Sequence, residues 1–177
     1  MTLHQLYAEA LNAPSDIRQH LNKLGSLAAG QRVVEFGTRR GTSTLALLAS
    51  FPISVVTYDL DRCVEVEPIA EAAKAAGIPF ESRHEDIDKL AEIPPCDFLF
   101  CDAMHNGNSV AIQLELGRAA GAHTMASHDT EIFGENGDLP GTPGILVAFR
   151  NFLTKYPEWK ITYHNPESFG LTVISKL

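Results

Sequence analysis

Acidic side chains follow four short apolar runs of this chain, in positions where they could bind a ligand or take part in a reaction. They are Glu35, Asp59, Asp102 and Asp129, and two histidines lie close to the last two, at His105 and His128. Carboxylates accept hydrogen bonds from a ligand's hydroxyl groups and bind divalent cations. An imidazole has an ordinary pKa near neutrality and can accept a proton in a reaction. These residues are therefore the first candidates for binding and catalysis.

The stretch from residue 33 to residue 43 reads VVEFGTRRGTS and has the layout of a nucleotide-type pocket. An apolar strand ends in an acid, turns through Gly37 and Gly41, and enters a helix begun by Thr42 or Ser43. The glycines lack a Cβ atom, so the backbone can turn sharply and approach a ligand closely. A phosphate-binding loop would place a Lys before the Thr or Ser, and a dinucleotide loop would read G-x-G-x-x-G. The G-x-x-x-G spacing therefore predicts a cofactor held near an acid, without a phosphate to cradle.

Composition narrows the class of protein. The chain has 177 residues, 45% of them hydrophobic, which fits one domain with a substantial core. The formal charge is −8 and no stretch is rich in Lys or Arg, which argues against nucleic acid as a partner. The three cysteines lack paired spacing, so neither a disulfide framework nor a zinc site is expected. No basic-then-apolar signal begins the chain and no apolar run reaches the ~20 residues of a membrane span, so we expect a cytoplasmic protein.

Helix and strand signals alternate along the chain. Helices are expected at 3–12, 15–27, 42–50, 65–76, 107–118 and 145–156, with a weak helical turn near 86–91. Ser15, after Pro14, is the expected N-cap of the second helix. Strands are expected at 31–36, 53–59, 79–83, 97–101, 122–127, 159–164 and 169–175. Four glycines and two prolines predict a long loop at 131–144.

This alternation predicts an α/β fold with a doubly wound, mostly parallel seven-stranded sheet. No helix lies between the last two strands, only the short stretch at 164–168, which indicates an antiparallel hairpin at one edge of the sheet. The chain divides into N-terminal helices at 1–29 and a cofactor-binding domain at 30–177. In such sheets the ligand binds outside the carboxyl ends of the strands, which is where the four acids are expected.

Five segments, at 34–43, 55–59, 96–105, 127–130 and 170–174, follow one another in a recognisable order. In order and spacing the chain resembles the class I S-adenosylmethionine-dependent methyltransferases, and most of all the small O-methyltransferase-like group called methyltransferase family 24. The resemblance runs from about residue 30 to the end of the sequence. It implies a Rossmann-like sheet, S-adenosylmethionine as the cofactor, and methyl transfer to the hydroxyl group of a small-molecule acceptor.

The resemblance also implies a set of cofactor-binding residues: Glu35, Gly37, Thr38, Gly41, Ser43, Asp59, Asp86 and Asp102. Glu35 and Gly37 would line the amino-acid end of the cofactor, and Asp59 would accept hydrogen bonds from the ribose hydroxyls. Asp86 would meet the adenine amino group, and Asp102 would lie beside the reacting methyl group. The family often has a middle glycine in the first loop, where this chain has Arg39 and Arg40.

Local structural roles compete with these cofactor roles. Glu35 could cap the following helix or pair with Arg39 or Arg40, and Asp59 could be an ordinary turn residue. Asp86 has helix N-capping as an equal alternative, because Asp is common before a short helix. The two arginines are expected to be solvated or paired with a nearby acid.

Two reaction mechanisms stay open for the residues expected beside the methyl group of the cofactor. Asp102, His128 and Asp129 fall where metal-dependent O-methyltransferases bind Mg²⁺. Magnesium prefers oxygen ligands, whereas an imidazole suits manganese, iron or zinc better. Alternatively, His105 or His128 acts as a general base without a metal. In a third alternative, His128 only forms a hydrogen bond at the sheet edge, and Asp129 only caps the segment that follows it.

Two other classes of protein also stay open. One is a cofactor-binding subunit without catalysis, and the other is an NAD-dependent oxidoreductase, against which the missing third glycine counts. The acceptor could be a sugar or phenolic hydroxyl or a small amine, and a second subunit, as in a homodimer, could enclose it. The segment 131–144 directly follows Asp129 and is expected to be a mobile lid over the acceptor.

Overall fold

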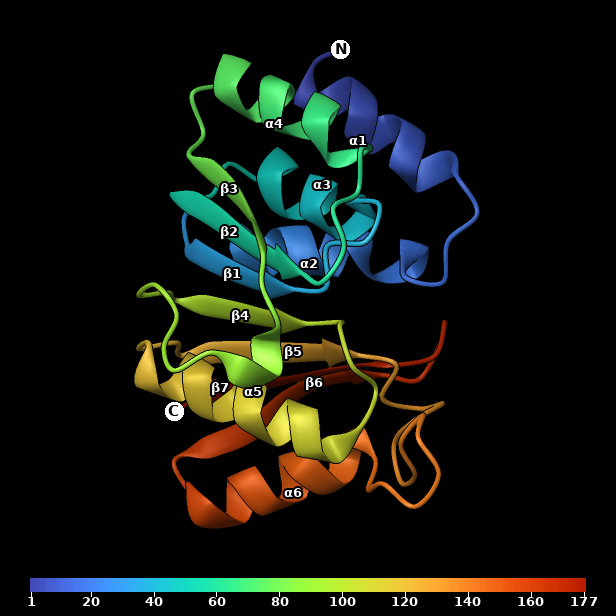
Figure 1. Cartoon of the computed structure of the whole chain (residues 1–177), viewed down its shortest axis with the longest axis vertical. Coiled ribbons are helices and arrows are strands. Elements are labelled where there is room, and N and C mark those ends of the chain that lie inside the picture. The colour runs from blue at the N-terminus through green and yellow to red at the C-terminus, as the bar shows by residue number, and fades with distance from the viewer.

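A seven-stranded sheet runs through the middle of the molecule in a computed structural model that describes residues 1–177 (Figure 1). Its strands lie in the order β3-β2-β1-β4-β5-β7-β6. The first five are parallel, and β7 pairs antiparallel with both β5 and β6. The strands are β1 Arg32–Phe36, β2 Ser54–Asp59, β3 Phe80–His84, β4 Phe98–Cys101, β5 Thr124–His128, β6 Trp159–Asn165 and β7 Leu171–Lys176. The predicted doubly wound sheet with an antiparallel edge pair is confirmed.

Strand β4 shows why the sheet needs helices on both faces. All four of its residues are buried, and their side chains point alternately to opposite faces. Phe98 and Phe100 join one hydrophobic core, and Leu99 and Cys101 join the other. An uninterrupted apolar run of this kind is typical of a parallel strand covered on both sides.

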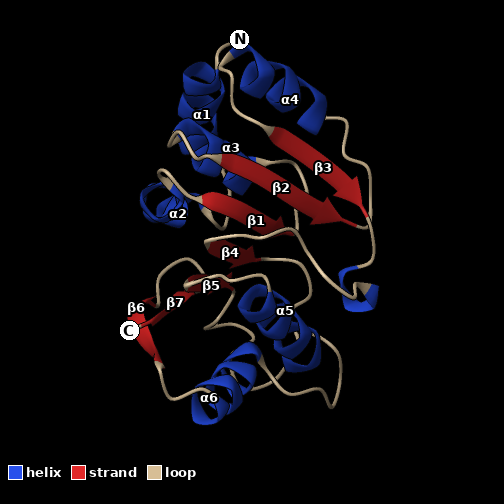
Figure 2. Ribbon diagram, turned by 90° about the vertical axis from the view of Figure 1, so that its left-hand side faces the viewer, coloured by secondary structure: helices blue, strands red, loops and turns tan.

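Helices form a layer on each face of the sheet (Figure 2). The helices α1 Leu3–Asn12, α2 Leu21–Ala28, α3 Thr42–Ala49 and α4 Val66–Ala75 share one core, and α5 Gly107–Ala119 and α6 Ile145–Lys155 share the other. Two short 3₁₀ helices, η1 Arg18–His20 and η2 Ile87–Lys89, complete the elements. None of the helices is long and apolar enough to cross a membrane.

The N-terminal residues share the core of the sheet. Leu3 and Leu6 from α1 pack in the same cluster as Leu21 and Leu24 from α2, together with Phe98 of the central strand. The helix predicted at 15–27 is wrong at its start, because α2 begins only at Leu21. Ser15 is no N-cap: its hydroxyl donates to Asp16, whose carboxylate also accepts from the backbone N–H of Ile17. These local bonds favour a turn over a helix.

The segment 131–144 contains turns and a single isolated bridge between Asn136 and Pro143. The backbone N–H of Gly107 donates to the carbonyl of Pro143 over 2.6 Å. A Cβ atom on Gly144 would overlap the backbone of Gly134, so the ends of the segment pack tightly together. Residues 138–141 are exposed and form its free tip.

Candidate active site

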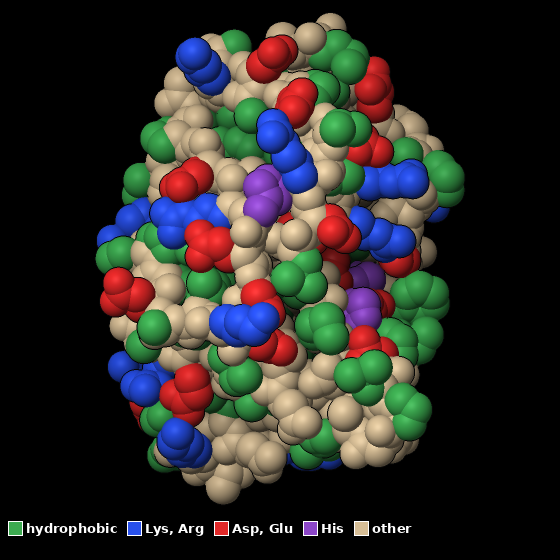
Figure 3. Space-filling model, viewed as in Figure 1, with side chains coloured by type: hydrophobic (Ala, Val, Ile, Leu, Met, Phe, Trp, Pro, Cys, Tyr) green, Lys and Arg blue, Asp and Glu red, His purple; other side chains and the backbone are tan.

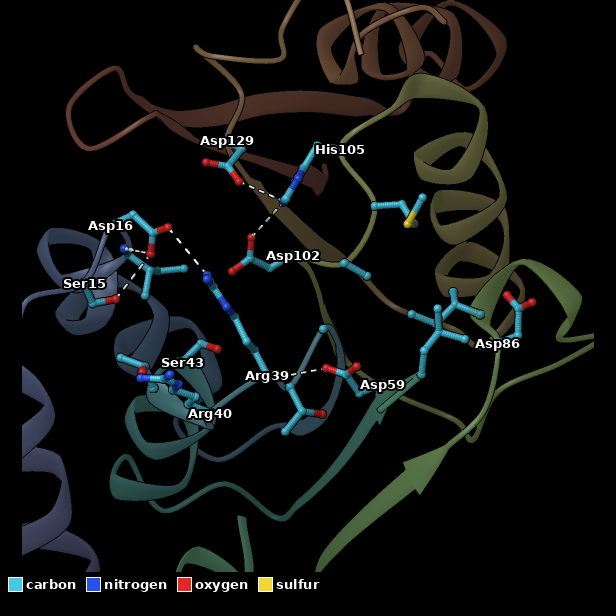
Figure 4. Close-up of a pocket in the computed structure, with 18 of the residues that line it drawn as sticks. Ser15, Asp16, Arg39, Arg40, Ser43, Asp59, Asp86, Asp102, His105 and Asp129 are labelled. Carbon is cyan, nitrogen blue, oxygen red and sulfur yellow. Dashed lines mark hydrogen bonds and ion pairs between the residues drawn. The ribbon is translucent and has the colours of Figure 1, made fainter. Parts of the chain in front are cut away.

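A cavity of about 690 Å³ opens at the carboxyl ends of β1, β2 and β4 (Figure 4). Only 5 of its 20 lining residues are hydrophobic, so the cavity suits a polar ligand. On the face seen in Figure 3, acidic side chains and histidines gather toward the right, at the level of the middle of the sheet. The acids that line the cavity are Asp16, Asp59, Asp86, Asp88, Asp102 and Asp129.

Glu35 lies beneath the cavity and is fully buried near the end of β1. Its two carboxylate oxygens accept from the hydroxyls of Ser43 and Thr44, over 2.5 and 2.6 Å. Burial raises the pKa of Glu35 to about 7, and the hydroxyl donors oppose that rise only in part. Glu35 therefore ties β1 to the first turn of α3 and pairs with neither arginine. Ser43 lines the cavity, whereas Glu35 itself does not.

The two glycines of the first loop adopt left-handed backbone conformations, with φ of 94° at Gly37 and 77° at Gly41. The sharp turns were correctly predicted, but the close approach is to the protein. A Cβ atom on Gly37 would overlap the Asp102 carbonyl, and one on Gly41 would meet the side chain of Ile69. Gly37 lines the cavity and Gly41 does not. Between them, Thr38 lines the cavity and bonds its buried hydroxyl to Thr57.

Asp59 is held by the backbone of two loops. One carboxylate oxygen accepts from the N–H of Arg39 over 2.7 Å, and the other accepts from the N–H of Asp61 over 3.1 Å. A carboxylate oxygen has a second acceptor site, so Asp59 can still receive two hydroxyl donors from a ligand in the cavity. Asp86 lines the cavity as well, but it also caps η2 by accepting from the backbone of Asp88.

Arg39 extends across the cavity from its loop, where its backbone has a left-handed φ of 45° (Figure 4). Its guanidinium lies 3.8 Å from Asp16, and its side chain is 84% exposed. Arg40 lies 3.9 Å from Glu65 and is 77% exposed. Both arginines are thus weakly paired with a nearby acid, as expected.

The three residues predicted to bind a metal come together at one end of the cavity, where Asp102 and Asp129 line it and the buried His128 lies beside them. Asp102 follows β4, while His128 ends β5 and is followed by Asp129. The Nδ1 atom of His128 lies 3.3 Å from an Asp102 oxygen and 3.4 Å from an Asp129 oxygen. One potential ligand atom from each residue lies within 4.8 Å of the other two. His105 approaches from the other side, with its Nε2 atom 2.9 Å from Asp129 and 3.9 Å from Asp102.

The orientation of the His128 ring is set by its second nitrogen. Nε2 lies 2.9 Å from the carbonyl oxygen of Ser168, which can only accept, so Nε2 carries the proton. Nδ1 consequently faces the two carboxylates. Metal-binding histidines characteristically donate their other N–H to a carbonyl or carboxylate in this way. The donor set of two carboxylates and one imidazole therefore fits a divalent cation.

The charges at this end are tightly coupled. Burial opposes a charge on His105, but hydrogen bonds to Asp102 and Asp129 outweigh it and raise the pKa of His105 to about 10. The pKa of His128 is also raised, against the effect of burial, by the neighbouring Asp102. The pKa of Asp129 is lowered, because its contacts with both imidazoles outweigh its burial. The two carboxylates thus favour the charged forms of both imidazoles, and the imidazoles favour the charged form of Asp129.

Several residues of the site carry no recognisable signal in the sequence. The segment Pro14–Ile17 forms one wall of the cavity. Phe133 stacks on His105, with ring centroids 5.1 Å apart and planes 9° apart. Ser168 contributes only a carbonyl, and His20 lies buried against His128. An isolated histidine and a backbone oxygen can be assigned only once the fold brings them to the site.

Neither a protein-family model nor a curated protein sequence matches the chain. Solved structures do match. The O-methyltransferase from Bacillus cereus in complex with S-adenosylhomocysteine has a TM-score of 0.69 at 20% identity, over 98% of this chain and 89% of that one. TomG from Streptomyces achromogenes, an O-methyltransferase of tomaymycin synthesis in complex with S-adenosylmethionine, has a TM-score of 0.65 at 22% identity, over 98% and 89%.

A third structure extends the comparison to a nitrogen acceptor. It is the 1,6-didemethyltoxoflavin-N1-methyltransferase from Burkholderia thailandensis, with a TM-score of 0.64 at 14% identity over 93% of this chain and 80% of that one. The narrower assignment to methyltransferase family 24 stays a prediction. The arrangement of strands and helices is common to all three structures. The chain thus has the fold of the class I S-adenosylmethionine-dependent methyltransferases.

Proposed function

We propose that the chain transfers the methyl group of S-adenosylmethionine to a hydroxyl group of a small-molecule acceptor, with a divalent cation held by Asp102, His128 and Asp129. The observation that carries this proposal is the convergence of these three side chains at one end of a polar cavity. Structural neighbours from Bacillus cereus and Streptomyces achromogenes, solved with S-adenosylhomocysteine and S-adenosylmethionine, support the choice of cofactor.

Asp59 would hold the ribose of the cofactor. Its carboxylate is oriented by two backbone N–H groups and lines the cavity. Asp86 and Ile87 form the neighbouring wall, where the adenine would lie. The methionine part would then extend over Gly37 and Ser43 toward Asp102, which brings the sulfonium to the acidic end of the cavity.

The proposed cation would contact two carboxylate oxygens and one imidazole nitrogen. This mixed set accepts Mg²⁺ with several waters, and the imidazole makes Mn²⁺ a better match. Such a cation supplies a lower pKa for an acceptor hydroxyl and a fixed place for its oxygen. Phe133 and Asp129 position the ring of His105 beside that oxygen's expected location.

The contacts at this end of the cavity favour the metal over a histidine base. The Nε2 atom of His105 is occupied by the two carboxylates, 2.9 Å from Asp129 and 3.9 Å from Asp102. The Nε2 atom of His128 is likewise occupied by Ser168. These contacts leave the His128 Nδ1 atom and the carboxylates as the available donors to a cation.

Calorimetric titration with S-adenosylhomocysteine, with and without Mn²⁺, tests the proposal first. Tight binding of the nucleoside is expected, and NADH should not compete for the same site. Absence of S-adenosylhomocysteine binding would refute the function, and competition by NADH would favour an oxidoreductase.

Turnover is then measured with radiolabelled S-adenosylmethionine and a panel of acceptors that offer a hydroxyl group: sugars, phenols and carboxylic acids. Small amines are included because the Burkholderia thailandensis neighbour is an N-methyltransferase by name. Methyl transfer to a hydroxyl compound that stops on chelation is the expected result. Cofactor binding without transfer to any acceptor would favour a non-catalytic subunit.

A further inference from the structure

The turn between β6 and β7 has an unusual backbone. Three consecutive residues, Ser168, Phe169 and Gly170, have left-handed φ angles of 44°, 68° and 92°. Glycine adopts this region freely, whereas Ser and Phe do so at a cost in conformational energy. A turn of this kind persists only when its surroundings hold it in place, and such turns are concentrated at functional sites.

Two carbonyl groups of this turn point at residues 128–131, the segment that includes His128 and Asp129 of the proposed cation site. The Ser168 carbonyl accepts from His128 over 2.9 Å, and the Phe169 carbonyl accepts from the backbone N–H of Glu131 over 2.8 Å. Asp129, between them in sequence, has a left-handed φ of 58°. The turn therefore holds the backbone on both sides of Asp129.

His20 is the side chain that holds the turn from the other direction. Its ring is fully buried, and its Nε2 atom lies 3.0 Å from the Glu167 carbonyl and 3.3 Å from the Ser168 carbonyl. Both acceptors are carbonyls, so Nε2 carries the proton. Its Nδ1 atom is buried without a partner, and its ring packs edge-on against His128, with centroids 5.5 Å apart.

We infer that His20 is a positioning residue for the reacting end. The His20 N–H fixes the Ser168 carbonyl, and that carbonyl accepts from the Nε2–H of His128. The His128 ring is thereby oriented with its Nδ1 atom facing Asp102 and Asp129. The part of this inference that concerns cation affinity rests on the proposed function, whereas the part that concerns the orientation of the His128 ring does not.

A purely structural role for His20 makes a different prediction. If only its volume mattered, His20→Phe would preserve the site, because the aromatic shape is retained. If the N–H matters, His20→Gln should preserve much of the site, because the Gln amide can donate at about the same distance from the backbone as the His20 Nε2 atom. His20→Asn is shorter by one methylene and serves as a second variant that keeps polarity without reaching the carbonyls.

The test combines two readouts on the full chain. Proton–nitrogen NMR of the imidazoles, in metal-free protein, reports whether the His128 Nε2–H is hydrogen-bonded and protected from exchange with water. Titration with Mn²⁺ alone, followed by electron paramagnetic resonance, reports the affinity of the site. His123→Phe is the control, because His123 is exposed and precedes β5, at the opposite end of that strand from His128.

In the parent protein and in His20→Gln, we expect a protected His128 Nε2–H signal. In His20→Phe and His20→Asn, this protection should be lost and Mn²⁺ affinity should fall by about tenfold, the lower end of the range for partners behind metal ligands. An unchanged His128 spectrum in both variants would overturn the inference. A shifted spectrum in a protein whose parent binds no Mn²⁺ would support the role of His20 while refuting the metal site.

Discussion

The buried carboxyl of Glu35 makes the stability of the fold depend on pH. Its pKa is raised from 4.5 to about 7 by complete burial, although Ser43 and Thr44 donate to it. Below the unfolded value both states hold the proton, and above it the unfolded chain loses the proton first. Ionisation therefore destabilises the folded chain as the pH rises from 4.5 to about 7. One pKa unit corresponds to about 1.4 kcal/mol, so the total cost is roughly 3 kcal/mol.

Replacing Glu35 with Gln removes this ionisation and keeps the side-chain shape. We expect the free energy of unfolding of Glu35→Gln, relative to the parent, to increase by roughly 3 kcal/mol across that pH window and to change little above it. Urea unfolding followed by circular dichroism at a series of pH values measures the difference. Glu158→Gln, at an exposed position, corrects for the change in net charge. Parallel stability curves for the parent and Glu35→Gln would refute the reasoning.

Three further predictions concern the cavity. Asp59→Ala should weaken S-adenosylhomocysteine binding by about 3 kcal/mol, roughly a hundredfold, because two hydrogen bonds to a charged acceptor are lost. Calorimetry measures the affinity, with Asp61→Ala as the control, and an Asp59→Ala affinity equal to that of the parent would contradict ribose binding. Asp129→Asn should abolish the response of activity to Mn²⁺. In metal-free protein it should also return the pKa of His105 toward its ordinary value, and an NMR titration that still gives a His105 pKa of about 10 would contradict the assigned contacts. Amide exchange in the tip 138–141 should slow when cofactor and acceptor are both bound, and an unchanged rate would remove its role as a lid.

Most of the fold could be predicted because its signals are local. The central strand at 98–101 is an apolar run too short for a helix, and the five residues at 166–170 leave no room for a crossover helix. Asp59 ends its strand, and Asp102 and Asp129 directly follow theirs, so the rule for ligand sites in parallel sheets locates these three at the cavity without any knowledge of the tertiary structure. These features need no information from distant parts of the chain.

The remaining details depend on partners far away in the sequence. His20 and the Glu167 carbonyl are separated by 147 positions, and no local pattern joins them. The close approach at Gly37 is to the loop after another strand, which sequence alone could not distinguish from a ligand. Ile17, Leu21 and Leu24 have a helical spacing, yet the Asp16 carboxylate accepts from the backbone N–H of Ile17 and favours a turn before Leu21.

The insertion of β7 between β5 and β6 has a consequence for the order in which the molecule can open. Asp59, which we propose binds the ribose, ends β2 in the first third of the chain, whereas His128 depends on a carbonyl from the hairpin at the far edge. Strand β6 pairs only with β7, so this edge can detach with the loss of a single ladder. Under the proposed function, a molecule that opened there would still bind the cofactor, while the cluster of Asp102, His128 and Asp129 would have come apart. Binding and turnover would then be lost at different temperatures, with turnover failing first.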